Sequence, residues 1–197
     1  MTSRLAFVAA VLAVRLAAQG VSVVNGASFR PELTAGSWAT AQGSFGSITA
    51  TTASAFPIPT TLNGVTVSVG GQAAPVYYVS GNQINFLIPY ATQPGIRAVE
   101  VKTGASTFTA SARVISAAPG LFVDFNDTGL PRKGAILNEN NSVNGSGTPS
   151  QRGQVIQIFG TGPGVLSSNP ADGTAVGSDP LVRSRSTPQV FIGGVEA

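Results

Sequence analysis

Short runs of alternating apolar and polar residues recur through the middle of the chain, and they restrict its fold more than any other feature. In residues 64–71 (GVTVSVGG), for example, every second residue is a valine. The apolar faces of four such runs are formed by Val65, Val67 and Val69, by Ile84, Phe86 and Ile88, by Val99 and Val101, and by Phe108, Ala110, Ala112 and Val114. Because successive side chains of a strand point to opposite sides, this alternation predicts strands with one buried and one wet face.

Turn-forming residues separate these runs at short spacing: Gly70-Gly71, Ser80-Gly81-Asn82, Gln93-Pro94-Gly95 and Thr103-Gly104. The composition agrees, since the chain has 24 Gly and 13 Pro and only 10% charged residues, whereas long helices favour Ala, Leu and charged side chains. No window longer than ten residues after residue 20 has a helical period. The sequence therefore predicts an all-β chain and an immunoglobulin-like antiparallel β-sandwich.

The stretch YYVSGNQINFLIPY (residues 77–90) contains a polar segment, Ser80-Gly81-Asn82-Gln83, between two apolar runs. We interpret it as the connection between strands 76–79 and 84–88 rather than as a polar site. Gln83 and Asn85 then fall on the face opposite Ile84, where we expect them to bond neighbouring backbone.

The N-terminus resembles a secretory signal. A positive charge at Arg4 precedes ten apolar residues (5–14), and RLAAQG ends in small residues, with cleavage expected near Ala18 or Gly20. The run is too short for a membrane span. A chain without cysteine that carries such a signal indicates a bacterial exported protein, secreted or at the cell surface. The alternative is a short N-terminal helix of the fold.

The charge of the mature chain is close to neutral. Without Arg4 and Arg15, nine of the eleven basic residues remain against eight acidic residues, a net charge near +1. No run of Lys or Arg and no interleaving of basic and aromatic residues occurs. We therefore expect no nucleic-acid partner and no membrane span after signal cleavage.

Two pairs of segments indicate an internal repeat. GSWATAQG (36–43) matches GQVIQIFG (153–160) at an offset of 117 residues, and VGGQAA (69–74) matches IGGVEA (192–197) at an offset of 123. Two matches at nearly equal offset predict a tandem repeat.

The repeat predicts four segments, one complete module plus a truncated second module. They are a signal peptide (1–20), a complete β-sandwich module (21–118), a connector with a short hairpin in AILNENNSVNG (119–152), and the N-terminal part of a second β module (153–197). Because the second module lacks counterparts of the strands from residue 77 onward, we expect the chain to be a fragment or a truncated product. We also expect residues 153–197 to be packed less well than residues 21–116.

Several of these motifs occur in order along the chain: VVNGASF, LNGVTVSVGGQAAPVYYVSGNQINFLIPY, AAPGLF, ILNENNSVN and FGTGPG. Together they resemble an uncharacterised tandem module at the C-terminal ends of large exported proteins from soil bacteria. The resemblance covers roughly residues 21–197 and implies an immunoglobulin-like fold related to the IPT group. It implies no catalytic residues, and the second half of the family's repeat is missing here.

The amino-acid composition of the chain argues against catalysis and against a bound cofactor. The chain has no His and no Cys, which excludes disulfides, thiolate or imidazole metal ligands, and histidine-based triads. The remaining bases for a serine nucleophile are Lys102 and Lys133, and neither has a serine at a recognisable spacing. We therefore expect no enzyme activity, no cofactor and no metal.

Two loops contain weak motifs. DFNDTG (124–129) has the acids of a calcium loop, but its twelfth position is Ala135, so an Asx-rich turn is the simpler interpretation. FGTGPG (159–164) is glycine-rich but is followed by Val165, without the Gly-Lys-Ser/Thr of a phosphate loop. We interpret it as a turn that ends a strand.

Aromatic residues are the remaining candidates for ligand contact. The four main candidates are Tyr77, Tyr78, Tyr90 and Trp38, and Phe45 is a further one. These residues form a platform for a sugar if they lie on one exposed face, and otherwise they belong to the core or cap the sheet. We expect a structural or adhesion-type module, a spacer or docking element for other domains or proteins at the cell surface. The alternative is a carbohydrate-binding module with a polysaccharide partner, and an enzyme is the weakest interpretation.

Overall fold

The structure, a computed structural model, describes residues 20–104, 106–124, 127–129 and 132–197. Strands form throughout these residues and no helix does, so the predicted all-β class is confirmed. The signal peptide prediction lies almost entirely outside the described residues. In the described part of the chain, no helix is long and apolar enough to cross a membrane.

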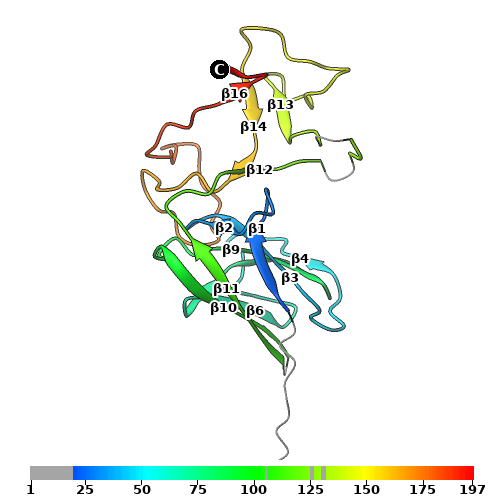
Figure 1. The fold of residues 1–197 in the computed structure, drawn as a ribbon, viewed down its shortest axis with the longest axis vertical. Helices are drawn as coiled ribbons and strands as arrows, with labels where there is room; N and C mark the ends of the chain where they lie inside the picture. Colours follow the sequence, from blue (N-terminus) through cyan, green and yellow to red (C-terminus); the bar gives the residue numbers. More distant parts are fainter. Residues whose placement is uncertain (1–19, 105, 125–126, 130–131) are drawn as a thin grey trace, which may run out of the picture.

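The first eleven strands form two stacked sheets, seen in the lower part of Figure 1. Their bounds are β1 Ser22–Asn25, β2 Glu32–Leu33, β3 Trp38–Gln42, β4 Thr51–Thr52, β5 Thr61–Leu62, β6 Val65–Val69, β7 Gln72–Ala74, β8 Val76–Val79, β9 Gln83–Leu87, β10 Gly95–Thr103 and β11 Ser106–Val114. One sheet has the order β1-β3-β9-β8-β4, and the other β2-β11-β10-β6-β5 with β7 on β6. The pairs are antiparallel, as predicted, except that β2 runs parallel to β11.

The core lies between these two sheets and includes most residues of the predicted apolar faces together with residues of β1, β2, β3, β7 and β8. Strand β6 alternates between buried valines and partly exposed polar residues, as its sequence predicts. The members of the core are Val23, Leu33, Ala39, Ala41, Phe45, Val65, Val67, Val69, Ala74, Val76, Val79, Ile84, Phe86, Ile88, Val99, Val101, Phe108 and Ala112. Burial of these side chains is the main stabilising contribution to the sandwich.

The segment from Ser80 to Gln83 connects β8 to β9, which confirms the sequence interpretation. The Ser80 Oγ accepts from the Gln83 N–H (3.1 Å) and donates to Asn82 Oδ1 (2.9 Å), so the turn satisfies its own polar groups. The side chains of Gln83 and Asn85 bond each other rather than the neighbouring backbone that we expected, because both lie on the outer face of the same strand.

Residues from 120 onward form three two-stranded sheets beyond one end of the sandwich (Figure 1). They are β12 Gly120–Leu121 with β15 Gly160–Thr161, β13 Ile136–Asn138 with β14 Ile156–Ile158, and β16 Phe191–Ile192 with β17 Val195–Glu196. None of the residues in these sheets belongs to the hydrophobic core. This part of the chain therefore lies outside the core of the sandwich.

Strands on either side of residue 152 pair with each other. Strand β12 pairs with β15 and β13 with β14, so the segment predicted as a connector supplies strand partners for the segment predicted as the second module. The hairpin predicted in AILNENNSVNG is present: the Asn138 N–H donates to the Ser142 carbonyl (2.8 Å), and Asn141 has a φ of 63°. Asparagine tolerates this left-handed conformation.

Candidate ligand-contact cleft

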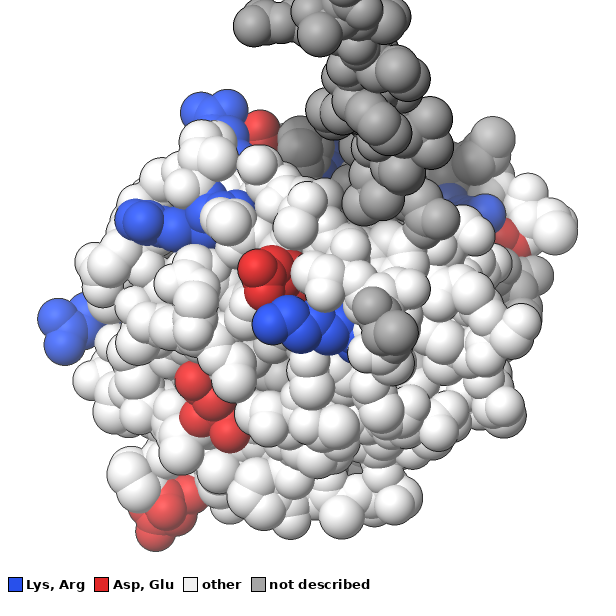
Figure 2. Space-filling model, turned by 90° about the horizontal axis from the view of Figure 1, so that it is seen from below, with Lys and Arg blue, Asp and Glu red and all other residues white. Residues whose placement is uncertain are grey.

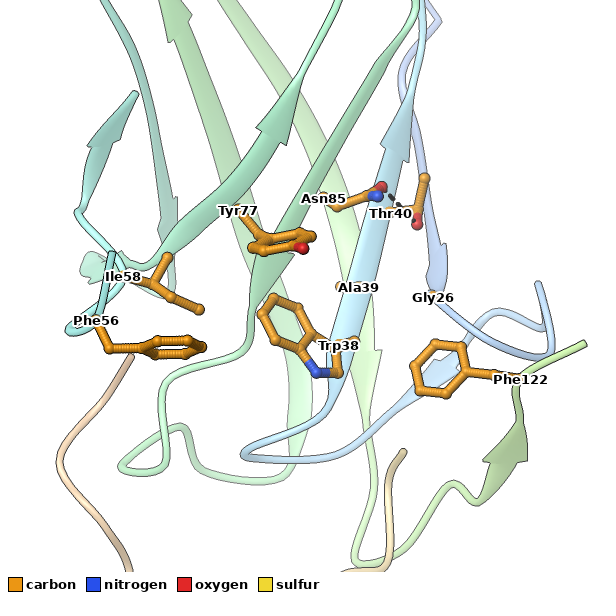
Figure 3. A pocket seen from close by; sticks show the side chains of 9 residues that line it. All are labelled: Gly26, Trp38, Ala39, Thr40, Phe56, Ile58, Tyr77, Asn85 and Phe122. Atoms are coloured by element: carbon orange, nitrogen blue, oxygen red, sulfur yellow. Dashed lines mark hydrogen bonds between the residues drawn. The ribbon is translucent and has the colours of Figure 1, made fainter. Parts of the chain in front are cut away.

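Two of the four predicted ligand-contact aromatics, Trp38 and Tyr77, lie together on the outer face of the sheet β1-β3-β9-β8-β4 (Figure 3). Their ring centroids are 5.5 Å apart and the rings are inclined by 61°, an edge-to-face contact. They line a cleft of about 360 Å³. The other two, Tyr78 and Tyr90, do not line this cleft.

The strands hold both rings in place. Trp38 is the first residue of β3, its register partner is Leu87, and its backbone N–H donates to the Thr161 Oγ1 (2.8 Å). Tyr77 lies where the register of β8 against β9 shifts between Val76 and Tyr78. Such an irregularity inserts an unpaired residue and redirects its side chain. Adjacent side chains of a strand point to opposite faces, so Tyr77 lies on the outer face beside the fully buried Val76.

Three polar side chains form a hydrogen-bonded row on the same sheet face. The Asn85 Oδ1 accepts from the Thr40 Oγ1 (3.1 Å) and from the Gln83 Nε2 (2.9 Å), and Thr40 and Asn85 line the cleft. Three donor groups of the cleft make no hydrogen bond within the described residues. They are the Asn85 Nδ2, the Trp38 Nε1 and the Tyr77 hydroxyl. The cleft therefore offers donor groups beside its aromatic rings.

The two ends of the cleft are closed by residues that the sequence reasoning missed: Phe56 and Ile58 at one end and Phe122 at the other (Figure 3). Phe56 is 63% exposed. Ile58 is buried, and its N–H donates to the Gly173 carbonyl (2.7 Å). The Phe122 N–H donates to the carbonyl of Phe159 (3.0 Å), so the part of the chain beyond the sandwich supplies this wall.

Tyr90 borders a neighbouring cleft of about 230 Å³, which shares Trp38, Phe56 and Ile58 with the first. Its backbone N–H donates to the Asp172 Oδ1 (2.8 Å). Burial, and secondarily the charge of Asp172, raise the pKa of the Tyr90 hydroxyl above its usual range. Tyr90 therefore belongs to the contact between the sandwich and the loop around residue 172.

Tyr78 lies on β8 opposite Thr52 of β4 and Asn85 of β9. It is partly exposed and lies opposite Asn85 on the outer face, but it is not among the residues that line the cleft. Of the four predicted aromatics, only Trp38 and Tyr77 thus line the first cleft. A further aromatic, Phe45, packs in the core against Phe108 with a centroid distance of 5.2 Å.

The calcium-loop motif falls partly outside the described residues, at positions 125 and 126. Its Asp127 accepts from the N–H groups of Lys133 (2.8 Å) and Gly129 (3.2 Å), and these bonds lower the pKa of the Asp127 carboxyl. This is the geometry of an Asx-rich turn. Among the described residues, no group of three or more acidic side chains could hold a metal ion.

The two lysines lie in different parts of the fold. Lys102 forms an exposed ion pair with Glu100 (3.3 Å), and Lys133 lies in the loop closed by Asp127. Basic and acidic residues are scattered over the face in Figure 2, and neither sign forms a continuous patch there. The nine residues that line the aromatic cleft include no carboxylate, lysine or arginine.

The segment FGTGPG ends β15 and packs on the sandwich. Gly162 has a φ of 78°, and a Cβ at this position would overlap the Ala118 carbonyl, so the turn needs glycine there. The Ala118 N–H donates to the carbonyl of Gly162 (3.1 Å). The motif serves as a strand-ending turn that docks one part of the chain on the other.

A comparison with models of known protein families finds no match, and a comparison with curated proteins finds no relative at a significant level. The kind of ligand that the cleft can bind is therefore inferred from its lining residues. Aromatic faces, unpaired donors and the lack of charge suit an uncharged ligand that has both apolar and hydroxyl or amide groups.

Proposed function

We propose that this chain is a non-enzymatic, exported β-sandwich module of immunoglobulin-like type, which acts as a docking or adhesion element at the cell surface. The observation that carries the proposal is the aromatic cleft around Trp38 and Tyr77, which has no charged group among its lining residues. Such a cleft binds a partner without supplying an acid or base for catalysis. Export, and membership of the soil-bacterial module, are supported by the N-terminal and motif patterns.

The second candidate is a carbohydrate-binding module, and the donor groups in the cleft favour it. Sugars present apolar C–H faces that pack on aromatic rings, and hydroxyl groups that accept from amide and indole N–H groups. Trp38 and Tyr77 provide the rings, and Asn85 and the Trp38 Nε1 provide donors. Phe56, which closes one end of the cleft, adds a third ring and is itself 63% exposed.

Glycan-array binding of the whole chain tests both candidates. Trp38→Ala and Tyr77→Ala are expected to abolish any glycan binding, whereas Phe191→Ala, which truncates an aromatic residue that is 60% exposed and does not line the cleft, is expected to preserve it. Glycan binding that survives both cleft substitutions would refute the cleft as the binding site. Absence of glycan binding, with cleft-dependent capture of a purified surface protein, would favour the docking role over the sugar-binding role.

We further propose that the residues from Ile136 onward begin a second copy of the sandwich. In the first copy Asn25 pairs with Ala39, and in the later segment Asn138 pairs with Ile156, which is Ala39 shifted by 117 residues. Asn138 is Asn25 shifted by 113 residues, and the next two pairs along these strands keep both shifts. The two strand pairs therefore have the same register. This supports a repeat more strongly than sequence similarity does, because a slip of one residue would turn every side chain of a strand to the opposite face of the sheet.

The final hairpin supports the same proposal. Strand β6 pairs Ser68 with Ala73, and β16 pairs Phe191 with Glu196, which are the same positions shifted by 123 residues. The connecting glycines have nearly equal φ angles: 57° and 83° at Gly70 and Gly71, and 61° and 84° at Gly193 and Gly194. Two consecutive positive φ angles are typical of the hairpin turn that requires glycine or asparagine.

A further inference from the structure

The aromatic cleft around Trp38 and Tyr77 adjoins the cleft that Tyr90 borders, here called the Tyr90 cleft. Their volumes are about 360 and 230 Å³, and Trp38, Phe56 and Ile58 line both of them. In Figure 3 the Trp38 indole has its Nε1 on the side away from Tyr77. A ligand in one cleft can therefore extend into the other by passing the Trp38 ring.

The Tyr90 cleft lies where the sandwich meets the later part of the chain. Leu87 and Tyr90 belong to the sandwich, whereas Thr161, Thr174 and Val176 belong to the later part. Neither this cleft nor the aromatic cleft has a carboxylate, a lysine or an arginine among its lining residues. The two parts of the chain thus form an uncharged surface together.

The loop at residues 171–174 is fixed against the sandwich at two points. The Ile58 N–H donates to the Gly173 carbonyl (2.7 Å), and the Tyr90 N–H donates to the Asp172 Oδ1 (2.8 Å). Gly173 has a φ of 77°, and a Cβ there would lie 2.7 Å from the Ile58 carbonyl oxygen, so this close approach needs glycine. The loop wall of the Tyr90 cleft is therefore in place before a ligand binds, which lowers the entropy cost of binding.

Both clefts present side-chain donors that are not used within the described residues. Two neighbouring side chains donate to the Asn85 Oδ1 (3.1 and 2.9 Å), which orients the amide so that its Nδ2 is available in the aromatic cleft. In the Tyr90 cleft, the Thr161 Oγ1 accepts from the Trp38 backbone N–H (2.8 Å), so its hydroxyl hydrogen is available. The Tyr90 hydroxyl likewise makes no hydrogen bond in the described part of the chain. Each cleft therefore combines aromatic rings with donors.

These features favour a sugar chain over a polypeptide or a charged ligand. Each sugar unit has hydroxyl and ether oxygens that accept from such donors, and C–H faces that pack on aromatic rings. A polypeptide brings an N–H with each carbonyl, and that N–H needs an acceptor of its own. A charged polymer would lose hydration in the clefts without gaining a partner of opposite charge.

We propose that the aromatic cleft and the Tyr90 cleft together hold a linear, uncharged polysaccharide, with sugar units in both clefts and Trp38 between them. This rests on the sugar-binding candidate proposed above. It adds that the ligand is a chain of several units and that the later part of the sequence takes part in binding. Val176 is 51% exposed and lines the Tyr90 cleft but not the aromatic cleft, so it contacts only a ligand long enough to pass Trp38.

Affinities of the whole chain for sugars of two lengths test the proposal. The probes are the disaccharides and hexasaccharides of cellulose, xylan, mannan and chitin, with a hexamer of galacturonic acid as the charged counterpart, measured by isothermal titration calorimetry. For at least one neutral glycan, we expect the hexasaccharide to bind about tenfold or more tightly than the disaccharide, because it fills both clefts. The galacturonic acid hexamer is expected to bind at least about tenfold more weakly than that hexasaccharide.

Two substitutions of exposed valines separate the Tyr90 cleft from a general effect of chain length. Val176→Glu places a charge where a bound chain would remove its hydration, and is expected to lower the ratio of hexasaccharide to disaccharide affinity at least about fivefold. Val143→Glu is the matched control, because Val143 is 69% exposed and lines neither cleft, and it is expected to keep the parent ratio. A gain that comes only from the many registers of a long chain on one cleft would not respond to Val176→Glu.

Failure of this proposal is distinguishable from failure of the proposed function. Equal affinities for the two lengths, a ratio that survives Val176→Glu, or equal binding of the galacturonic acid hexamer would overturn the two-cleft ligand. Disaccharide binding that Trp38→Ala abolishes would then still support sugar binding in the aromatic cleft. No binding of any neutral sugar would overturn both this proposal and the sugar-binding candidate, whereas cleft-dependent capture of a surface protein would still support the docking role.

Discussion

Substitution of Asn25 by alanine tests how the sandwich is joined to the rest of the chain. Asn25 is the last residue of β1 and is 1% exposed. Its Nδ2 donates to the Ala118 carbonyl (2.9 Å), and its Oδ1 accepts from the N–H groups of Ala27 (2.9 Å) and Ser28 (3.1 Å). One side chain thus joins β1, the turn after it and the segment that leads to β12.

The expected loss of stability follows from these three bonds. A hydrogen bond contributes about 1 kcal/mol net, and each buried partner left unsatisfied adds to the cost. Gly120 packs closely on this amide, since a Cβ at Gly120 would lie 2.6 Å from the Asn25 Oδ1. We therefore expect Asn25→Ala to lower the free energy of unfolding by about 3 kcal/mol, a large share of the usual total.

Urea denaturation followed by fluorescence measures this loss, because Trp38 is the single tryptophan and lies in the sheet that Asn25 supports. The matched control is Asn138→Ala. Asn138 is buried in a similar turn and donates to the Ser142 Oγ (3.0 Å) and the Thr148 carbonyl (2.8 Å), but it contacts no part of the core. We expect its effect on the Trp38 transition to be below about 0.5 kcal/mol. A loss under about 1 kcal/mol for Asn25→Ala, or equal losses for both variants, would refute the reasoning.

Two further predictions concern the core and the pH dependence. Phe86 is fully buried and lies between its strand partners Ala39 and Val76. Phe86→Ala leaves a cavity there and is expected to lower the free energy of unfolding by about 3–5 kcal/mol, measured by urea denaturation. An unchanged urea midpoint would contradict the assigned core. The raised pKa of Tyr90 means that the folded state favours the neutral hydroxyl. The contribution of Tyr90 to the free energy of unfolding is therefore fully present below the ordinary tyrosine pKa of about 10. It declines as the pH rises above that value, because the hydroxyl ionises more readily in the unfolded chain. Tyr90→Phe is expected to show a smaller decline in thermal midpoint above pH 10 than the parent chain, and identical declines would exclude Tyr90 as a source.

The candidate site was only partly predictable from sequence. Trp38 and Tyr77 were candidates because they are aromatic residues near strands, but so were Tyr78 and Tyr90, which the fold places elsewhere. The deciding feature is the pairing of β3 and β8 with the two edges of β9, which brings Tyr77 against Trp38. Phe56 and Phe122 gave no periodic signal, because both lie in irregular segments.

The alternating runs by themselves determined the strands, their buried faces and the turns between them, since side-chain alternation and the backbone freedom of glycine are local properties. The cleft depended on the tertiary structure. Trp38, Tyr77 and Phe122 come from distant parts of the chain, and they meet because β3 pairs with β9 while the segment after Ala118 docks through Thr161 and Gly162. Contacts between residues so far apart depend on the packing of whole sheets, which no local pattern encodes.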